Sequence, residues 1–199
     1  YQSAKNHRDR FITFASLNPK YAGWKDDLKQ CREEYEMSGI RMLPQYHDYK
    51  LSDDEAIEMI NMVTGMKMVI SVPIRMEDRR QRHWLDKVSD LQLSEIESAM
   101  KSCREARFII LNGRGFESMA KNEDLRESNF LIEISRLGVV LQGEIPRLIE
   151  ICGSSKLAFG TGIPFNYPAP SLLKMQMLDS GDVKNDLFYR NALQILDFD

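Results

Sequence analysis

The chain has 199 residues, of which 43% are hydrophobic, and its formal net charge is −3 at pH 7. This length and apolar content predict a single domain over residues 1–199 with one sizeable core. The small negative charge excludes strong electrostatic attraction to nucleic acid or to an anionic membrane, and no apolar run is long enough to span a bilayer.

Short apolar runs, most of them ended by a proline, glycine or asparagine, predict six strands along the chain. The predicted strands cover residues 11–17, 40–43, 66–72, 107–111, 129–134 and 157–159. Apolar residues at helical spacing predict helices between most of these strands and two more after the last one. The predicted helical segments lie at residues 24–35, 52–63, 94–103, 145–152, 172–178 and 183–196. Ser52 with Glu55, and Ser94 with Glu97, have the spacing of a capping box at a helix start.

The third predicted strand leads directly into the most polar stretch of the chain. Residues 66–72 are apolar on both faces, as in a parallel strand covered by helices, and Pro73 ends the ladder. The residues that follow form a dense polar cluster: Arg75, Glu77, Asp78, Arg79, Arg80, Arg82, His83 and Trp84. Ligands bind at the carboxyl ends of parallel strands, so this cluster is either a functional loop or a solvated one.

The alternation of strand and helix predicts an α/β fold with parallel neighbouring strands, because each connection is long enough for a right-handed helical crossover. Two architectures fit six such units. One is an open, doubly wound sheet. The other is a (β/α)8 TIM barrel whose first two strands are missing from this chain.

Several stretches resemble the amidohydrolase-related barrel proteins, a metal-dependent hydrolase superfamily that includes aminocarboxymuconate-semialdehyde decarboxylase. RFITFASLNP at 10–19, GIRMLPQYHDY at 39–49 and LAFGTGIPF at 157–165 resemble that family's third, fourth and eighth strands. Residues 66–72, 108–113 and 129–136 resemble the fifth, sixth and seventh, and NALQIL at 191–196 resembles the closing helix. The resemblance favours the barrel, and it implies that the first two strands, with the family's His-x-His pair, precede Tyr1.

The family's metal ligands do not carry over onto this sequence. The resemblance matches Ser71 and Asn112 to the histidines of the fifth and sixth strands, and Gly162 to the aspartate of the eighth. Serine, asparagine and glycine offer no strong donor to a zinc-type ion. We therefore expect no tightly held cofactor and no metal ligand in this chain, with a divalent zinc-type metal as the alternative if upstream residues supply ligands. Gly160 and Gly162 permit either a close backbone approach or a turn.

The cysteines give no sign of a metal or disulfide framework. Cys31, Cys103 and Cys152 are odd in number and far apart, and each falls on the apolar face of a predicted helix. We interpret them as reduced core residues.

Four polar residues near strand ends are candidates for chemistry. In a barrel the loop that carries Tyr46 and His47 faces the mouth, where an imidazole acts as general acid or base. The alternative is a surface-loop histidine. We predict catalytic roles for His47 and Asp78, and substrate contacts for Tyr46 and His83, although His83 in the charged loop also fits a structural contact.

Three further strand-end residues are predicted substrate contacts: Arg75, Asn112 and Arg136. The guanidinium of Arg75 is suited to bind a substrate carboxylate bidentately, and the open alternative is an ion-pair network with Glu77 and Asp78. The Asn112 amide is a neutral donor and acceptor that suits hydrogen bonding to a ligand.

These features lead to two main function hypotheses. The resemblance implies a hydrolase or decarboxylase that acts on a small carboxylated or cyclic substrate at the carboxyl-terminal rim of the barrel. The replaced ligand positions favour instead a barrel that binds a small ligand or a protein partner without turnover. In either case we expect a small-molecule ligand, no nucleic acid and no membrane, and a cytoplasmic protein, with a homo-oligomer left open.

Overall fold

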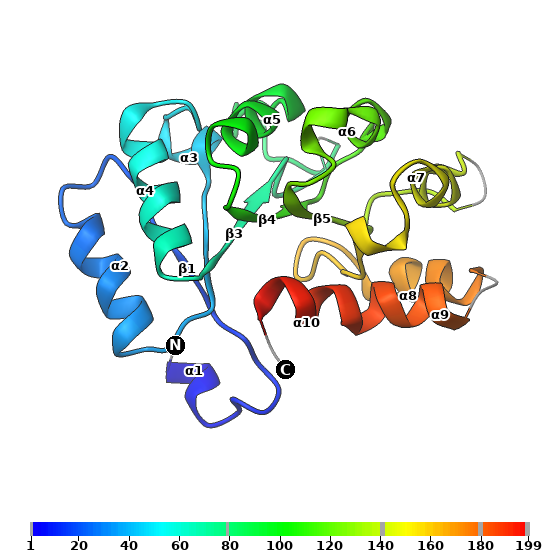
Figure 1. The fold of residues 1–199 in the computed structure, drawn as a ribbon, viewed down its shortest axis with the longest axis horizontal. Coiled ribbons are helices and arrows are strands. Elements are labelled where there is room, and N and C mark those ends of the chain that lie inside the picture. Colours follow the sequence, from blue (N-terminus) through cyan, green and yellow to red (C-terminus); the bar gives the residue numbers. More distant parts are fainter. Residues whose placement is uncertain (1, 79, 140–141, 179–180, 198–199) are drawn as a thin grey trace.

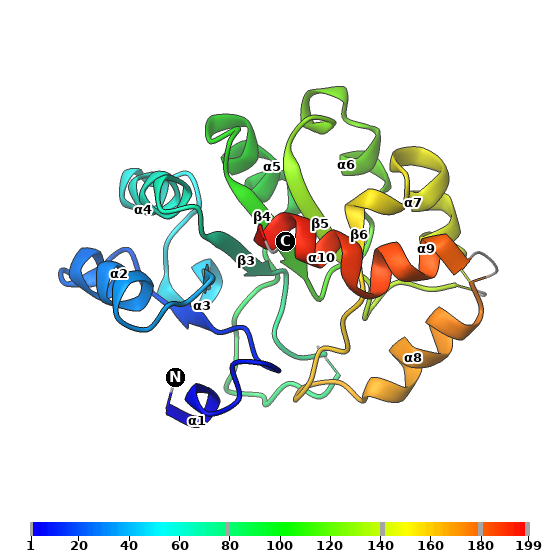
Figure 2. The same ribbon diagram turned by 60° about the horizontal axis from the view of Figure 1, so that its bottom comes forward.

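Six parallel strands form one sheet in this computed structural model, which describes residues 2–78, 80–139, 142–178 and 181–197. The strands are β1 (Phe14–Ser16), β2 (Gly39–Arg41), β3 (Val69–Pro73), β4 (Arg107–Leu111), β5 (Asn129–Glu133) and β6 (Leu157–Ala158). They pair in the order in which they occur in the sequence. A doubly wound sheet reverses its strand order at a switch point, whereas a TIM barrel does not. The strand order therefore supports the barrel, and the sheet is open between β1 and β6 (Figures 1 and 2).

Helices connect the strands and cover one face of the sheet (Figure 2). They are α1 (Gln2–Lys5), α2 (Trp24–Glu33), α3 (Pro44–His47), α4 (Asp54–Gly65), α5 (Leu93–Ser102), α6 (Glu117–Lys121), α7 (Glu144–Cys152), α8 (Pro168–Gln176), α9 (Gly181–Asn185) and α10 (Asn191–Leu196). Two 3-10 turns, η1 (Glu123–Leu125) and η2 (Ser154–Lys156), and one π-helical turn, η3 (Asp186–Arg190), complete the chain. No helix in the described part of the chain is long and apolar enough to cross a membrane.

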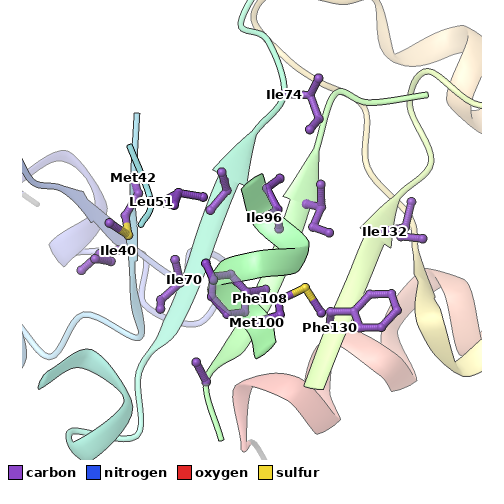
Figure 3. Packing of buried hydrophobic residues seen from close by; sticks show 14 of the residues in the cluster. Ile40, Met42, Leu51, Ile70, Ile74, Ile96, Met100, Phe108, Phe130 and Ile132 are labelled. Atoms are coloured by element: carbon purple, nitrogen blue, oxygen red, sulfur yellow. The ribbon is translucent and has the colours of Figure 1, made fainter. Parts of the chain in front are cut away.

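The main core lies between the sheet and the covering helices. Figure 3 shows Ile96 and Met100 of α5 lying against the sheet beside Phe108 and Phe130. Each of these side chains is at most 4% exposed. Burying one such side chain stabilises the fold by roughly 1.5–3 kcal/mol, so this layer fixes the sheet on which every strand-end residue sits. Cys31 and Cys103 are buried and Cys152 is half-buried, and all three thiols are free.

Strand register arranges the opposite, inner face of the sheet in rows. Ser16, Arg41, Ser71, Ile109 and Leu131 are paired across neighbouring strands and form one row. In a closed barrel such rows are packed layers of side chains. Here α10 covers the β6 end of the inner face, where Ile195 packs against Leu131 and Ala158 with Ile109 of β4 beside them. Toward β1 the row borders a cavity of about 380 Å³, which we call the inner cavity.

The predicted capping boxes are wrong. Neither α4, which begins after Asp53, nor α5, which begins after Gln92, has a side-chain hydrogen bond at its cap. The carboxylate of Glu97, a member of the box predicted for α5, instead accepts a hydrogen bond from Asn122 Nδ2 at 3.3 Å. A tertiary contact has thus taken the place of the local one that sequence spacing suggested.

Candidate functional site

A cavity of about 290 Å³ opens at the carboxyl ends of the strands, and we call it the rim cavity. Its walls are mostly apolar, with Leu111, Phe159 and Phe165 among them. Four polar side chains join the lining: Arg41, Asn112, Glu133 and Thr161. An apolar cavity with a few convergent polar groups is the usual form of a small-molecule site. Its volume is at the small end of the range for such sites, which suits a ligand about the size of a single substituted ring.

Glu133 is a buried carboxylate at the end of β5, only 5% exposed. Its Oε2 accepts hydrogen bonds from the backbone N–H of Asn112 at 3.2 Å and from the Ser135 hydroxyl at 2.7 Å. Its Oε1 accepts a bond from the Ser135 backbone N–H at 2.7 Å. Buried carboxylates require such partners. Glu133 therefore holds the turns that follow β4 and β5 together at the cavity wall.

Asn112 follows β4 with a φ of +56°, a left-handed conformation that asparagine tolerates better than most residues. Its Oδ1 lies 3.1 Å from Asn166 Nδ2 and 3.3 Å from the Ser135 hydroxyl. Its Nδ2 donates to the Met76 carbonyl at 3.4 Å. The Asn112 side chain thus connects the loop after β4 by hydrogen bonds to the loops after β3, β5 and β6.

Two glycines let these loops approach closely. A Cβ on Gly160 would lie 2.2 Å from Glu133 Oε1. Gly162 has a φ of +69°, and a Cβ there would lie 2.2 Å from Asn166 Nδ2. Both of the roles considered for these glycines, close approach and turn, are thus present at this rim.

Arg41 at the end of β2 borders both the rim cavity and the inner cavity. Its Nε donates to the Ser71 hydroxyl at 3.4 Å, and that hydroxyl donates to the Ile40 carbonyl at 3.2 Å. Burial lowers the pKa of Arg41 from its ordinary value, although a guanidinium keeps its proton at neutral pH. Among the described residues, no aspartate or glutamate forms an ion pair with Arg41. This arginine is therefore a cation facing a cavity without a protein counter-ion in the described chain.

Arg75 is held in an ion-pair network within the β3–α5 loop. Its Nη2 lies 2.5 Å from Oδ2 of Asp90, a residue that is only 7% exposed. Arg82 approaches the other oxygen of Asp90 at 3.5 Å and also pairs with Asp86. Of the two alternatives left open for Arg75, the structure places it in an ion-pair network, in which it pairs with Asp90. Arg79 lies outside the described residues.

Asp78 is held between two arginines. Arg80 bonds its carboxylate through Nε at 3.1 Å and through its backbone N–H at 2.9 Å, and Arg136 Nη1 lies 3.1 Å from Oδ2. These bonds, those from Arg80 first, lower the pKa of Asp78 well below its ordinary value. Asp78 therefore stays ionised at neutral pH, and it fixes the partly buried Arg136 beside β5.

The other predicted residues lie on neighbouring segments. His47 ends α3, its ring centroid is 6.4 Å from that of Tyr49, and its buried Nδ1 has no hydrogen-bond partner in the described part of the protein. Tyr46 is 37% exposed, and desolvation raises the pKa of its hydroxyl. His83 accepts a hydrogen bond from the Leu85 N–H at 3.2 Å.

Of the seven predicted site residues, only Asn112 lines the rim cavity. The roles predicted for Tyr46, His47, Arg75 and His83 stay predictions, as do those for Asp78 and Arg136. Sequence reasoning missed Arg41 and Glu133. Each is a charged residue inside an otherwise apolar strand, and that is the signal that would have found them, because such residues are rarely buried without a specific role or partner.

The donor set of the described residues does not fit a divalent metal. Those residues contain no group of three or more histidine, cysteine, aspartate or glutamate side chains placed to hold an ion. Ser71 and Asn112 offer only neutral oxygen, and both oxygens of Glu133 already accept hydrogen bonds. The expectation that no metal is tightly held stays a prediction.

No family model matches the chain, and no curated protein matches it. Solved structures do. One is 2,6-dihydroxybenzoate decarboxylase in complex with 2,6-dihydroxybenzoate, with a TM-score of 0.76 and 14% identity, covering 98% of this chain and 74% of that one. A second is a protein from Staphylococcus aureus provisionally named an amidohydrolase, with a TM-score of 0.73 and 12% identity. The match covers 99% of this chain and 77% of that one.

A third is a dihydroxybenzoic acid decarboxylase from Polaromonas sp. with bound manganese and the inhibitor 2-nitroresorcinol, with a TM-score of 0.73 and 13% identity, covering 98% and 72%. At these identities the comparisons show the fold. The barrel fold that was predicted from the sequence is confirmed.

Replacing Gly160 with alanine is expected to disrupt the Glu133 network, because the added Cβ would overlap Glu133 Oε1. Overpacking of this kind costs about 1–3 kcal/mol, and we expect a lower melting temperature in thermal unfolding. Gly65→Ala is the control, since nothing lies within 4 Å of its added Cβ. Equal melting temperatures for the two variants would contradict the close approach.

Asp78→Asn is expected to lower stability at neutral pH by about 1 kcal/mol. The folded-state pKa of Asp78 lies below its ordinary value of 3.8, so its contribution is present above pH 3.8 and is lost as the pH falls toward the folded-state pKa. Urea unfolding at several pH values should show a deficit that shrinks in acid. Asp124→Asn is the control, because Asp124 forms an exposed ion pair with Lys101, and it should lower the free energy of unfolding less. If the loss of stability in Asp78→Asn does not change with pH, the ionised Asp78 does not contribute through its arginine partners.

Proposed function

We propose that the rim cavity binds a small carboxylated ring compound, and that the protein acts on it as a hydrolase or decarboxylase of the amidohydrolase-like kind. The observation that carries the proposal is the position of Arg41: a guanidinium faces a cavity whose other walls are mainly apolar. Such a cavity matches a ligand with an apolar ring and an anionic group, because the ring gains from burial and the anion gains a charge-assisted hydrogen bond.

The structural neighbours support the substrate class. One of them holds 2,6-dihydroxybenzoate and another holds 2-nitroresorcinol, both of which are single substituted rings. These compounds belong to those proteins, and what this chain shares with them is the fold. A carboxylated aromatic compound of this size is accordingly the first substrate to test.

Residues of this chain have distinct parts in the proposal. Arg41 contacts the carboxylate, and Asn112 sets the polar wall beside it. Glu133 holds Asn112 and Ser135 in place through the hydrogen bonds that its two oxygens accept. His47 remains our candidate acid or base, because it lies on α3 directly after the strand of Arg41 and its Nδ1 has no partner among the described residues.

A second candidate function is binding without turnover. It is favoured by the absence, among the described residues, of a cluster that could hold a metal ion. It is favoured also by the composition of the rim cavity, whose described lining includes no histidine. In this form the barrel would recognise the same carboxylated ring compound and release it unchanged.

Calorimetric titration with 2,6-dihydroxybenzoate, and with resorcinol as the matched compound that lacks the carboxylate, tests the proposal. We expect the acid to bind more tightly than resorcinol. Incubation with the acid, with and without added manganese, then separates the two candidates. Formation of resorcinol and carbon dioxide supports decarboxylation, whereas tight binding without product supports the second candidate. Failure to bind any of a panel of benzoates and cyclic carboxylates would contradict both.

A further inference from the structure

We propose that Arg41 is a built-in cation that holds the substrate carboxylate in place of a metal ion. This inference rests on the proposed function and makes it more specific. It assigns recognition of the acid to a residue of the strand, so that binding does not depend on an added divalent ion. It also names the ligand group that the site selects, a carboxylate attached to an apolar ring.

The position of Arg41 in the sheet is the first support. Register places it in the middle of one inner row, between Ser16 on β1 and Ser71 on β3. The Arg41 side chain bonds the Ser71 hydroxyl, so its positive charge is anchored to the neighbouring strand of the same row.

The way in which the guanidinium is held is the second support. Nε is bound to Ser71, and the Ser71 hydroxyl is in turn anchored on the Ile40 carbonyl. For Nη1 and Nη2 the described residues provide neither a hydrogen bond nor an ion pair. The two nitrogens of this planar end are spaced to bind both oxygens of one carboxylate. The Arg41 guanidinium is therefore held at Nε, while Nη1 and Nη2 are available to donate hydrogen bonds to both oxygens of one carboxylate.

Electrostatics supply the third support. A divalent cation placed beside Arg41 would be repelled by it, and a carboxylate there would be attracted. The one carboxylate in the lining of the rim cavity, Glu133, is occupied by hydrogen bonds from Asn112 and Ser135. Arg75 and Arg136, which were predicted to contact the substrate, are paired with Asp90 and Asp78. Of the arginines considered, Arg41 alone has no acidic partner in the described chain.

The test is calorimetric titration of the full chain with 2,6-dihydroxybenzoate and with resorcinol, in buffer with EDTA and in buffer with manganese. We expect the affinity for the acid to be the same in both buffers. Arg41→Gln should weaken binding of the acid by roughly 10- to 100-fold, as expected when one partner of a close charged pair is lost. Binding of resorcinol, which has no carboxylate, should be unchanged in this variant.

Matched variants separate charge from folding. Arg126→Gln removes an exposed arginine, 67% accessible at its side chain, and should bind like the wild type. Arg41→Lys keeps the charge without the planar fork and should give an intermediate affinity. Thermal unfolding of each variant shows whether it is folded. If the Arg41→Gln protein fails to fold, Arg41→Lys and Ser71→Ala remain as tests. Ser71→Ala keeps the charge of Arg41, so it should weaken binding of the acid less than Arg41→Gln.

Two results would overturn the inference. If EDTA abolishes binding of the acid and the Arg41 variants bind normally in manganese, a metal holds the carboxylate. The inference and the role of Arg41 are then wrong, while binding of a carboxylated ring compound by the protein stands. If the wild-type protein binds no carboxylated ring compound in either buffer, the proposed function itself is wrong.

Discussion

Parallel pairing in register is the constraint on which the rest of this structure depends. Because the six strands run the same way and pair in sequence order, their carboxyl ends meet at one rim and their inward side chains form rows. One row places Arg41 beside Ser71, and another brings Glu133 of β5 to the wall of the rim cavity. The polar groups of the candidate site are therefore fixed by the backbone of a buried sheet.

Much of the fold follows from local patterns. The predicted strand at 107–111 coincides with β4, and α7 ends at Cys152, as the predicted helix at 145–152 does. Gly153 follows with a φ of +79°, which few other residues tolerate. Strand order then separates the barrel from the doubly wound sheet, which the sequence pattern alone left open. The capping boxes failed, and Glu97 of the second one instead bonds the Asn122 amide, 25 residues away in the chain. A local pattern carries no information about such a distant partner.

The site was harder to predict than the fold for a physical reason. Sequence reasoning favoured charged loop residues, and in the structure many of these neutralise one another, as Arg75 does with Asp90 and Asp78 does with Arg136. Glu133 and Arg41 lie within strands instead. Glu133 accepts hydrogen bonds from backbone N–H groups and from the Ser135 hydroxyl, and Arg41 faces a cavity. Whether such a side chain points inward or outward depends on register and closure, which only the assembled sheet reveals.

A crystal structure of the protein with bound 2,6-dihydroxybenzoate would test the central claim most directly. The account predicts that the carboxylate lies in the rim cavity with both oxygens within hydrogen-bond distance of the Arg41 guanidinium, and that the ring lies among Leu111, Phe159 and Phe165. A carboxylate bound to a metal ion, or to Arg136 with Arg41 turned away, would contradict it.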